Sequence, residues 1–261
     1  MVYQGEPRVL DWRRPSTWNR TLRNHDFLLG YSDLRGNPLW VSYRLTPLPV
    51  GITPLKRPSH FLSDWRSFTR ISHDDYVDSG YDRGHMAPNH AISVLYGRAA
   101  QRDTFLMTNV TPQQAALNQK LWERLEEVEL DHFTRLGEIW VLTGPIFDDQ
   151  IERLPSAWRV EIPDAFYKVY AAPQAHAAPR LLAFIMPQRV RGNEPLDRYL
   201  VSVDKVEQLT GLDFFPELPL SIAGQIEAEI NPAPWDLAAV ARQASRYNSR
   251  QQPAPRHRRL H

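Results

Sequence analysis

Runs of β-branched and aromatic residues are spread along this chain without regular alternation with helices, and that order limits the folds it can adopt. Residues 39–45, 138–143, 166–170 and 181–186 each have the composition of a strand. Residues 104–108 form a shorter apolar run that predicts another buried strand. A doubly wound parallel sheet would need a helix after nearly every strand. We therefore predict an α+β fold with a central antiparallel sheet flanked by helices.

The length of 261 residues is enough to bury a full core and predicts a single domain. We place that domain at residues 37–233. Residues 1–36 are rich in Arg, Pro and Asn and predict an irregular N-terminal arm packed on the domain. Residues 234–261 shift towards Ala, Gln, Arg and Pro, which predicts a flexible basic tail.

The composition excludes several kinds of site. There is no cysteine, so disulfides, thiolate nucleophiles and cysteine-based zinc sites are excluded. The formal net charge is only +1, so binding to a polyanion would require basic residues concentrated in a cleft. No apolar run is long enough to span a membrane, and the first 14 residues contain no signal-peptide core. We expect a soluble chain.

The clearest helix is predicted to begin near residue 115 or 116. Four apolar residues recur at the helical interval and form its predicted buried seam. The seam consists of Leu117, Leu121, Leu125 and Val128. On a neighbouring face, Asn118, Trp122 and Glu126 follow one another at intervals of four, with a drift of roughly 40° per step. An amide and a carboxylate are thereby placed on one side of one helix.

A second, short helix is predicted over residues 203–210. Ser202 is its predicted N-cap and Gly211 its predicted C-terminal stop.

The chemistry of the chain is concentrated between residues 81 and 126. Residues 81–88 read Tyr-Asp-Arg-Gly-His-Met-Ala-Pro, and residues 108–113 read Thr-Asn-Val-Thr-Pro-Gln. A neutral histidine can take a proton from water, and its ordinary pKa near 6.5 suits that task. An asparagine carbonyl is a hard oxygen ligand suited to Mg²⁺. With a carboxylate on the next helix, these groups predict a site that cuts phosphodiester bonds.

Other motifs are absent from the sequence. It contains no His-Glu-x-x-His, P-loop, dinucleotide fingerprint or Gly-x-Ser-x-Gly. Residues 73–78 are acidic but lack the glycine and terminal glutamate of a calcium loop. The histidine and asparagine pattern is therefore the strongest functional signal in the chain.

Taken together, these motifs resemble the DNA/RNA non-specific endonucleases, a family that includes sugar-non-specific bacterial nucleases and mitochondrial endonuclease G. The similarity runs from about residue 30 to about residue 212. It implies a ββα-metal, or His-Me finger, core within the domain. It also implies hydrolysis of DNA and RNA with little sequence specificity, giving 5′-phosphate ends.

The resemblance also implies a role for each matching residue. His85 would be the general base, and Asn118 would be the direct protein ligand of Mg²⁺, with Mn²⁺ able to substitute. Glu126 would hold metal-bound water, and Asn109 would orient His85 or its loop. Arg57 would contact phosphate, for which guanidinium geometry is well suited.

Asp82, Arg83 and Gln113 are predicted to support the site or contact substrate. Simpler interpretations stay open for each. Asp82 and Arg83 could form an internal ion pair, and Gln113 could fix backbone groups. Trp122 could be core only, and Glu126 could be a solvated helix acid.

Two other function classes stay open as well. One is a catalytically inactive nuclease-like module that binds nucleic acid or protein, and the other is a phosphodiesterase acting on nucleotides.

Expected partners are DNA and RNA, and a dedicated protein inhibitor, because an unspecific nuclease endangers its host. We expect no membrane partner, and monomer and homodimer are both open. The resemblance favours a periplasmic or secreted bacterial protein, whereas the missing signal peptide points the other way.

Overall fold

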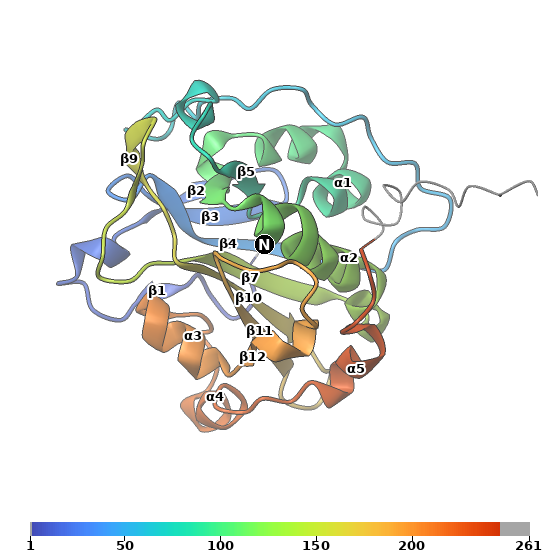
Figure 1. Ribbon diagram of the computed structural model, residues 1–261. Coiled ribbons are helices and arrows are strands. Elements are labelled where there is room, and N and C mark those ends of the chain that lie inside the picture. Colours follow the sequence, from blue (N-terminus) through green and yellow to red (C-terminus); the bar gives the residue numbers. More distant parts are fainter. Residues whose placement is uncertain (1, 246–261) are drawn as a thin grey trace, which may run out of the picture.

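The computed structural model describes residues 2–245. Within them, the main sheet has seven strands in the order β12-β11-β10-β7-β4-β3-β2, and every neighbouring pair is antiparallel (Figure 1). Its strands are β2 (Arg20–Arg23), β3 (Phe27–Ser32), β4 (Asn37–Leu45), β7 (Ile139–Ile146), β10 (Ala165–Ala172), β11 (Arg180–Pro187) and β12 (Leu200–Val201). The predicted α+β class with a central antiparallel sheet is confirmed.

Smaller elements surround this sheet. Three short antiparallel pairs join β1 (Arg8–Val9) to β13 (Leu212–Asp213), β5 (Asp82–His85) to β6 (Val110–Gln113), and β8 (Arg153–Leu154) to β9 (Ala157–Glu161). The α-helices are α1 (Asn89–Thr104), α2 (Glu123–Asp131), α3 (Val203–Thr210), α4 (Leu220–Ile226) and α5 (Leu237–Val240). Short 3₁₀ helices lie at Pro15–Thr17, Asp74–Tyr76, Met107–Asn109, Phe133–Leu136, Leu196–Tyr199 and Ala233–Trp235.

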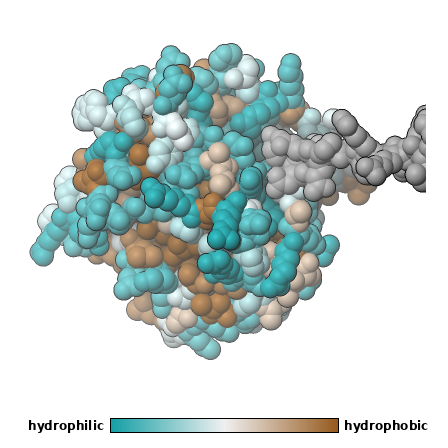
Figure 2. All heavy atoms as spheres, viewed as in Figure 1, coloured by the Kyte–Doolittle hydropathy of each residue, from teal (hydrophilic) through white to brown (hydrophobic). Residues whose placement is uncertain are grey.

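The main sheet separates two hydrophobic cores. Successive side chains of a strand point to opposite faces. On β10, Phe166 and Tyr170 pack in the core that contains the α2 seam, whereas Tyr167 and Val169 pack in the core beneath α3. Hydrophilic side chains cover most of the surface in Figure 2, and hydrophobic ones gather in its lower half, where Figure 1 places α3 and α4. The helices near β5 and the C-terminal helices α3 and α4 therefore occupy opposite sides of the sheet.

The predicted helix after β6 forms, but its first turns differ from expectation. All four seam residues are buried. Residues Leu117–Trp122 are a π-helix, and the regular helix α2 begins only at Glu123. A π-helix bonds each N–H one residue further back than an α-helix does, so the simple four-residue register does not hold here. Asn118 lies within this widened segment.

The second predicted helix is confirmed at both ends. The Ser202 hydroxyl accepts a hydrogen bond from the backbone N–H of Lys205, and Gly211 has the left-handed conformation with φ 71°. Helix α3 therefore begins and ends where its caps predicted.

The predicted strand at residues 104–108 is wrong. Thr104 is the last residue of α1, and Met107–Asn109 form a 3₁₀ turn. Only Leu106 makes a β-bridge, to Leu62. A short apolar run has the same appearance in a buried helix end as in a strand, which explains the error.

The two segments interpreted as an arm and a tail are partly built into the fold. Strands β2 and β3 lie within residues 1–36 and complete one edge of the main sheet. At the other end, Trp235, Leu237 and Val240 are buried in the core beneath α2. Both segments are rich in Arg and Pro, the first also in Asn and the second in Gln, so their overall composition did not predict that these apolar residues belong to the sheet and the core. The rest of the predicted flexible tail, residues 246–261, lies outside the described residues.

No helix among the described residues combines the length and the apolar character that crossing a bilayer requires.

The placement of Trp235 can be tested by truncation of its side chain. Its ring packs edge-on against Phe133 with 5.2 Å between centroids. Trp235→Ala is expected to lower the free energy of unfolding by about 3–5 kcal/mol, because it empties a buried aromatic site. Chemical denaturation gives the value, with Trp158→Ala as control, since Trp158 is 77% exposed. Equal effects of the two substitutions would contradict the placement.

Candidate active site

The pair of strands β5 and β6 presents His85 at the end of β5, where it lies opposite Val110. The imidazole lies between two aromatic rings, with 5.1 Å to the centroid of Phe61 and 5.0 Å to that of Phe105. Its Nε2 atom is buried and has no hydrogen-bond partner within residues 2–245. The imidazole is therefore held in place by aromatic packing against Phe61 and Phe105.

Two effects act on the pKa of His85. Burial, and secondly the positive charge of Arg57, lower the pKa of His85 to about 3. Both effects disfavour the imidazolium form. The ring is thus neutral over the physiological pH range, because its pKa lies well below the ordinary value near 6.5.

Arg57 comes from the long segment between β4 and β5 and reaches this site. Its guanidinium lies over the ring of Phe105, 5.0 Å from the centroid, so Arg57 and His85 contact the same aromatic ring. Partial burial lowers the pKa of Arg57, while the charge of Glu126 raises it. An arginine remains a cation at neutral pH even so.

Asn109 fixes the loop that follows His85. Its Oδ1 accepts from the backbone N–H of Ala87 at 2.9 Å, and its Nδ2 donates to the carbonyls of Ala87 at 3.1 Å and Thr104 at 3.0 Å. The backbone carbonyl of Asn109 also accepts from the N–H of Met86 at 3.0 Å. All of its side-chain bonds go to backbone, so the amide clamps the loop rather than the imidazole.

Asn118 is tied directly to the strand that carries His85. Its Nδ2 donates to Oδ2 of Asp82 at 2.9 Å, and Gln119 Nε2 donates to the same oxygen at 2.7 Å. This bond spans 36 residues and connects the start of β5 to the π-helix. Because the carboxylate holds the amide nitrogen, the carbonyl oxygen of Asn118 is directed elsewhere and can accept or bind a cation.

Arg83 and Gln113 take neither of their simpler predicted roles. Arg83 donates to the carbonyl of His73 at 2.8 Å and does not pair with Asp82. Gln113 is buried, and neither amide atom bonds any group among residues 2–245, so it does not fix backbone groups. It fills the space beside Gly84, where an added Cβ would lie 2.1 Å from Gln113 Oε1. A side chain at position 84 would therefore require the Gln113 side chain to move.

Residues 14–221 match the family described as DNA/RNA non-specific endonuclease. The chain belongs to this family. Human mitochondrial endonuclease G is 30% identical over 214 residues, covering 77% of this chain and 71% of that protein. A nuclease from Nostoc sp. (strain PCC 7120 / SAG 25.82 / UTEX 2576) is 28% identical over 225 residues, covering 82% and 79%. A mitochondrial nuclease of Saccharomyces cerevisiae is 27% identical over 227 residues, covering 79% and 68%.

Similarity extends to a solved structure of this non-specific endonuclease family. A crystal structure of an EndoG/EndoGI complex, described as giving the mechanism of EndoG inhibition, matches with a TM-score of 0.65 and 25% identity. The match covers 78% of this chain and 89% of that one. Together with the family, the relatives indicate a DNA/RNA non-specific nuclease. Strands β5 and β6 pair with each other and a helix follows β6, as predicted for the ββα core, with α1 inserted between the two strands.

Beneath the candidate active site lies a buried ion pair, between Lys168 and Glu129, that was not predicted from the sequence. Lys168 of β10 is fully buried, with its Nζ 2.7 Å from Glu129 Oε2, 3.1 Å from Tyr43 Oη and 3.8 Å from Glu126 Oε1. Burial raises the pKa of Glu126 to about 8, with Lys168 lowering it and Glu129 and Glu123 raising it further. Glu126 is thus a partly exposed acid over a buried ion pair, not a simple solvated helix acid.

A signal for Lys168 was present in the sequence. It interrupts the apolar run Phe-Tyr-Lys-Val-Tyr at residues 166–170, and strand alternation places it on the same face as Phe166 and Tyr170. A lysine on a core-facing position needs an acidic partner.

Substitution of Lys168 tests its buried ion pair with Glu129. Lys168→Met leaves the buried Glu129 without its cation, and the free energy of unfolding is expected to fall by about 3–5 kcal/mol. The double variant Lys168→Met with Glu129→Gln removes the stranded charge and should recover a large part of the loss. Chemical denaturation of both variants distinguishes the two outcomes. A double variant no more stable than the single one would contradict the pairing.

Proposed function

We propose that the chain is a metal-dependent endonuclease that hydrolyses phosphodiester bonds in DNA and RNA and leaves 5′-phosphate ends. One observation carries the proposal. The hydrogen bond between Asp82 and Asn118 joins the strand that carries His85 to the helical segment that carries Asn118 and leads to Glu126. This bond thereby connects the elements that carry a proton acceptor (His85), a neutral oxygen ligand (Asn118) and a carboxyl group (Glu126).

The donor set suits Mg²⁺, or Mn²⁺ in its place. Relatives of the endonuclease G type depend generally on a metal ion. Asn118 would hold the ion through Oδ1, since its amide nitrogen is occupied by Asp82. The Glu126 side chain is partly exposed, so it can hold a water beside the ion. When bound, the ion supplies Lewis-acid stabilisation of the charge on phosphate and leaving oxygen.

His85 acts as the general base in this proposal. The neutral ring accepts the proton of the attacking water. A base works best when its pKa lies near the operating pH, whereas the pKa of His85 without substrate is lowered to about 3. A phosphate bound to Arg57 would cancel the charge that contributes to this lowering. Substrate binding would then raise the pKa of His85 and strengthen the base.

The remaining groups position the reactants. Arg57 binds a phosphate oxygen from its place beside Phe105. Asn109 holds the loop after His85 and so sets the direction of the ring. These side chains address phosphate and metal, and phosphate contacts carry no sequence information directly. Low sequence preference follows from this.

DNA and RNA are the proposed substrates, and a dedicated inhibitor is a proposed protein partner. The similar solved structure is a complex of EndoG with EndoGI, described in terms of EndoG inhibition.

For localisation, some relatives are mitochondrial and others are bacterial or fungal nucleases. We propose export to the periplasm or medium. Fractionation of expressing cells tests this, and a purely cytosolic protein would contradict it.

Substitution of His85 tests the general base. Purified protein should degrade both plasmid DNA and RNA with Mg²⁺ and neither with EDTA. His85→Ala is expected to lower the rate by about 10²–10⁴-fold, the usual contribution of a general base. His176→Ala is the control, because His176 is exposed and far along the chain from the motif. Circular dichroism and substrate binding should stay unchanged in both. Full activity of His85→Ala would overturn the proposal.

Titration of the imidazole tests the effect of Arg57. In the metal-free chain, the NMR signal of His85, assigned with the His85→Ala variant, should not titrate between pH 5 and 8. Arg57→Ala removes a positive charge near the ring, which favours the imidazolium form, so the midpoint should move to higher pH. Arg102→Ala, at an exposed position on α1, should leave it unchanged. A wild-type midpoint close to 6.5 would show that burial does not act as described.

A further inference from the structure

A second group of oxygen ligands lies on the other side of the main sheet. Helix α3 and the segment after α4 cover the core that contains Tyr167 and Val169, opposite the core of the α2 seam. Figure 1 shows α3 and α4 below the sheet and β5 above it. This region contributes no residue to the proposed nuclease site.

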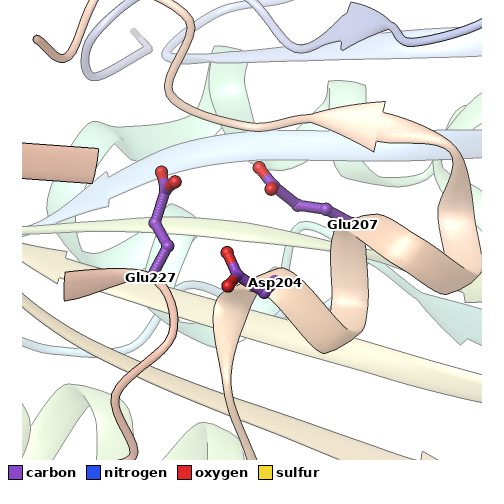
Figure 3. A group of neighbouring side chains, drawn as sticks. All are labelled: Asp204, Glu207 and Glu227. Carbon is purple, nitrogen blue, oxygen red and sulfur yellow. The ribbon is translucent and has the colours of Figure 1, made fainter. Parts of the chain in front are cut away.

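Three carboxylates converge here. One oxygen from each of Asp204, Glu207 and Glu227 lies within 4.8 Å of the others. Figure 3 shows the side chains turned towards a common space, two from α3 and one from the residue that follows α4. Asp204 and Glu207 are three residues apart and so share a helix face. The N–H of Asp204 donates to the carbonyl of Glu227 at 3.1 Å, which joins the two segments.

Glu227 supplies an observation independent of the clustering. Its side chain is only 7% exposed, and its Oε1 is buried with no hydrogen-bond partner within residues 2–245. Its neighbours in the cluster are carboxylates, which in the ionised form can only accept. A buried polar atom without a partner costs stability. The carboxyl group that carries this oxygen is turned towards the space between the three acids (Figure 3), and a positive group there would give the oxygen a partner.

No positively charged side chain among residues 2–245 fills this role. Among the described residues, no ion pair links any of the three carboxylates to a lysine, arginine or histidine. Lys205, the nearest in sequence, instead donates to Gln208 at 3.0 Å. A fourth acid, Asp213, adds to the negative field. Burial first, and then the neighbouring acids, raise the pKa of Glu227 to about 7.

We propose that Asp204, Glu207 and Glu227 bind a divalent cation of the calcium type. The donors are all hard oxygens, which select Ca²⁺ or Mg²⁺ over softer metals. With Ca–O distances of about 2.3–2.6 Å, two ligands on opposite sides of Ca²⁺ lie roughly 5 Å apart, so oxygens within 4.8 Å of one another can reach a single ion. Mg²⁺ requires a tighter, near-octahedral arrangement. Waters complete the shell on the side of the exposed Asp204.

The bound ion would join α3 to the end of α4. It would give Glu227 Oε1 its missing partner and neutralise charges that now repel one another. Its effect is therefore on stability, and it is separate from catalysis. Binding to the native state alone raises the unfolding temperature as the ion concentration increases.

The experiment uses the full chain stripped of metal with EDTA and then titrated with CaCl₂. Calorimetric titration gives the affinity, and a thermal scan gives Tm. Asn118→Ala is the background for all variants, so that the proposed nuclease site does not contribute. Glu227→Gln is compared with Glu229→Gln, an exposed acid two residues further along.

Calcium is expected to bind and to raise Tm in the background protein and in the Glu229→Gln variant. Glu227→Gln should weaken binding by roughly tenfold or more, since loss of even an outer-shell partner has an effect of that order. Without calcium, Glu227→Gln should be at least as stable as the background protein, because a repelled charge is gone. This separates loss of the site from misfolding.

Two results would overturn the proposal. One is no calcium-dependent rise of Tm in the background protein, and the other is an equal rise with Glu227→Gln. Neither result bears on nuclease activity, which depends on residues on the other side of the sheet.

Discussion

The buried ion pair between Lys168 and Glu129 determines how α2 lies on the main sheet. Both side chains are fully buried, and the Oη atoms of Tyr43 and Tyr170 donate to the same carboxylate at 2.8 and 2.7 Å. An apolar seam alone would tolerate small rotations of a helix, because hydrophobic contact is not directional. A buried charge has to meet its partner, so the helix is held in one orientation. Glu126, one turn before Glu129, is thereby presented to the site.

The π-helix reconciles two demands on the segment after β6. Leu117 and Leu121 must face the core, and Asn118 must reach Asp82 on β5. The wider turn lets the chain satisfy both within six residues. Segments of this kind are uncommon and occur frequently at functional sites. The bond from Asp82 to Asn118 then links the strand of the proposed base to the helix of the proposed ligand and acid.

The two faces of the sheet have different proposed roles. One face supports His85, Asn118 and Glu126, whose proposed work is on phosphodiesters. The other supports three acids whose proposed ion stabilises the packing of α3 and α4. Both groups lie where helices cover the sheet, and both contain a buried carboxyl oxygen without a hydrogen-bond partner among the described residues. The nuclease site has a nearby cation in Lys168, whereas the acidic group on the far side has none among the described residues.

The sequence by itself determined the strand runs of the α+β sheet, the seam of the helix after β6 and the caps of α3, because each rests on local periodicity or residue chemistry. It also determined the order of the candidate site residues His85, Asn109, Asn118 and Glu126. Tertiary structure alone decided the rest. Several features arise from residues brought together from distant parts of the chain. They are strands β2 and β3, the core position of Trp235, the π-helix, the lowered pKa of His85, and the partners of Asp82 and Lys168. Burial and long-range pairing set these properties, and neither is encoded in any short stretch of sequence.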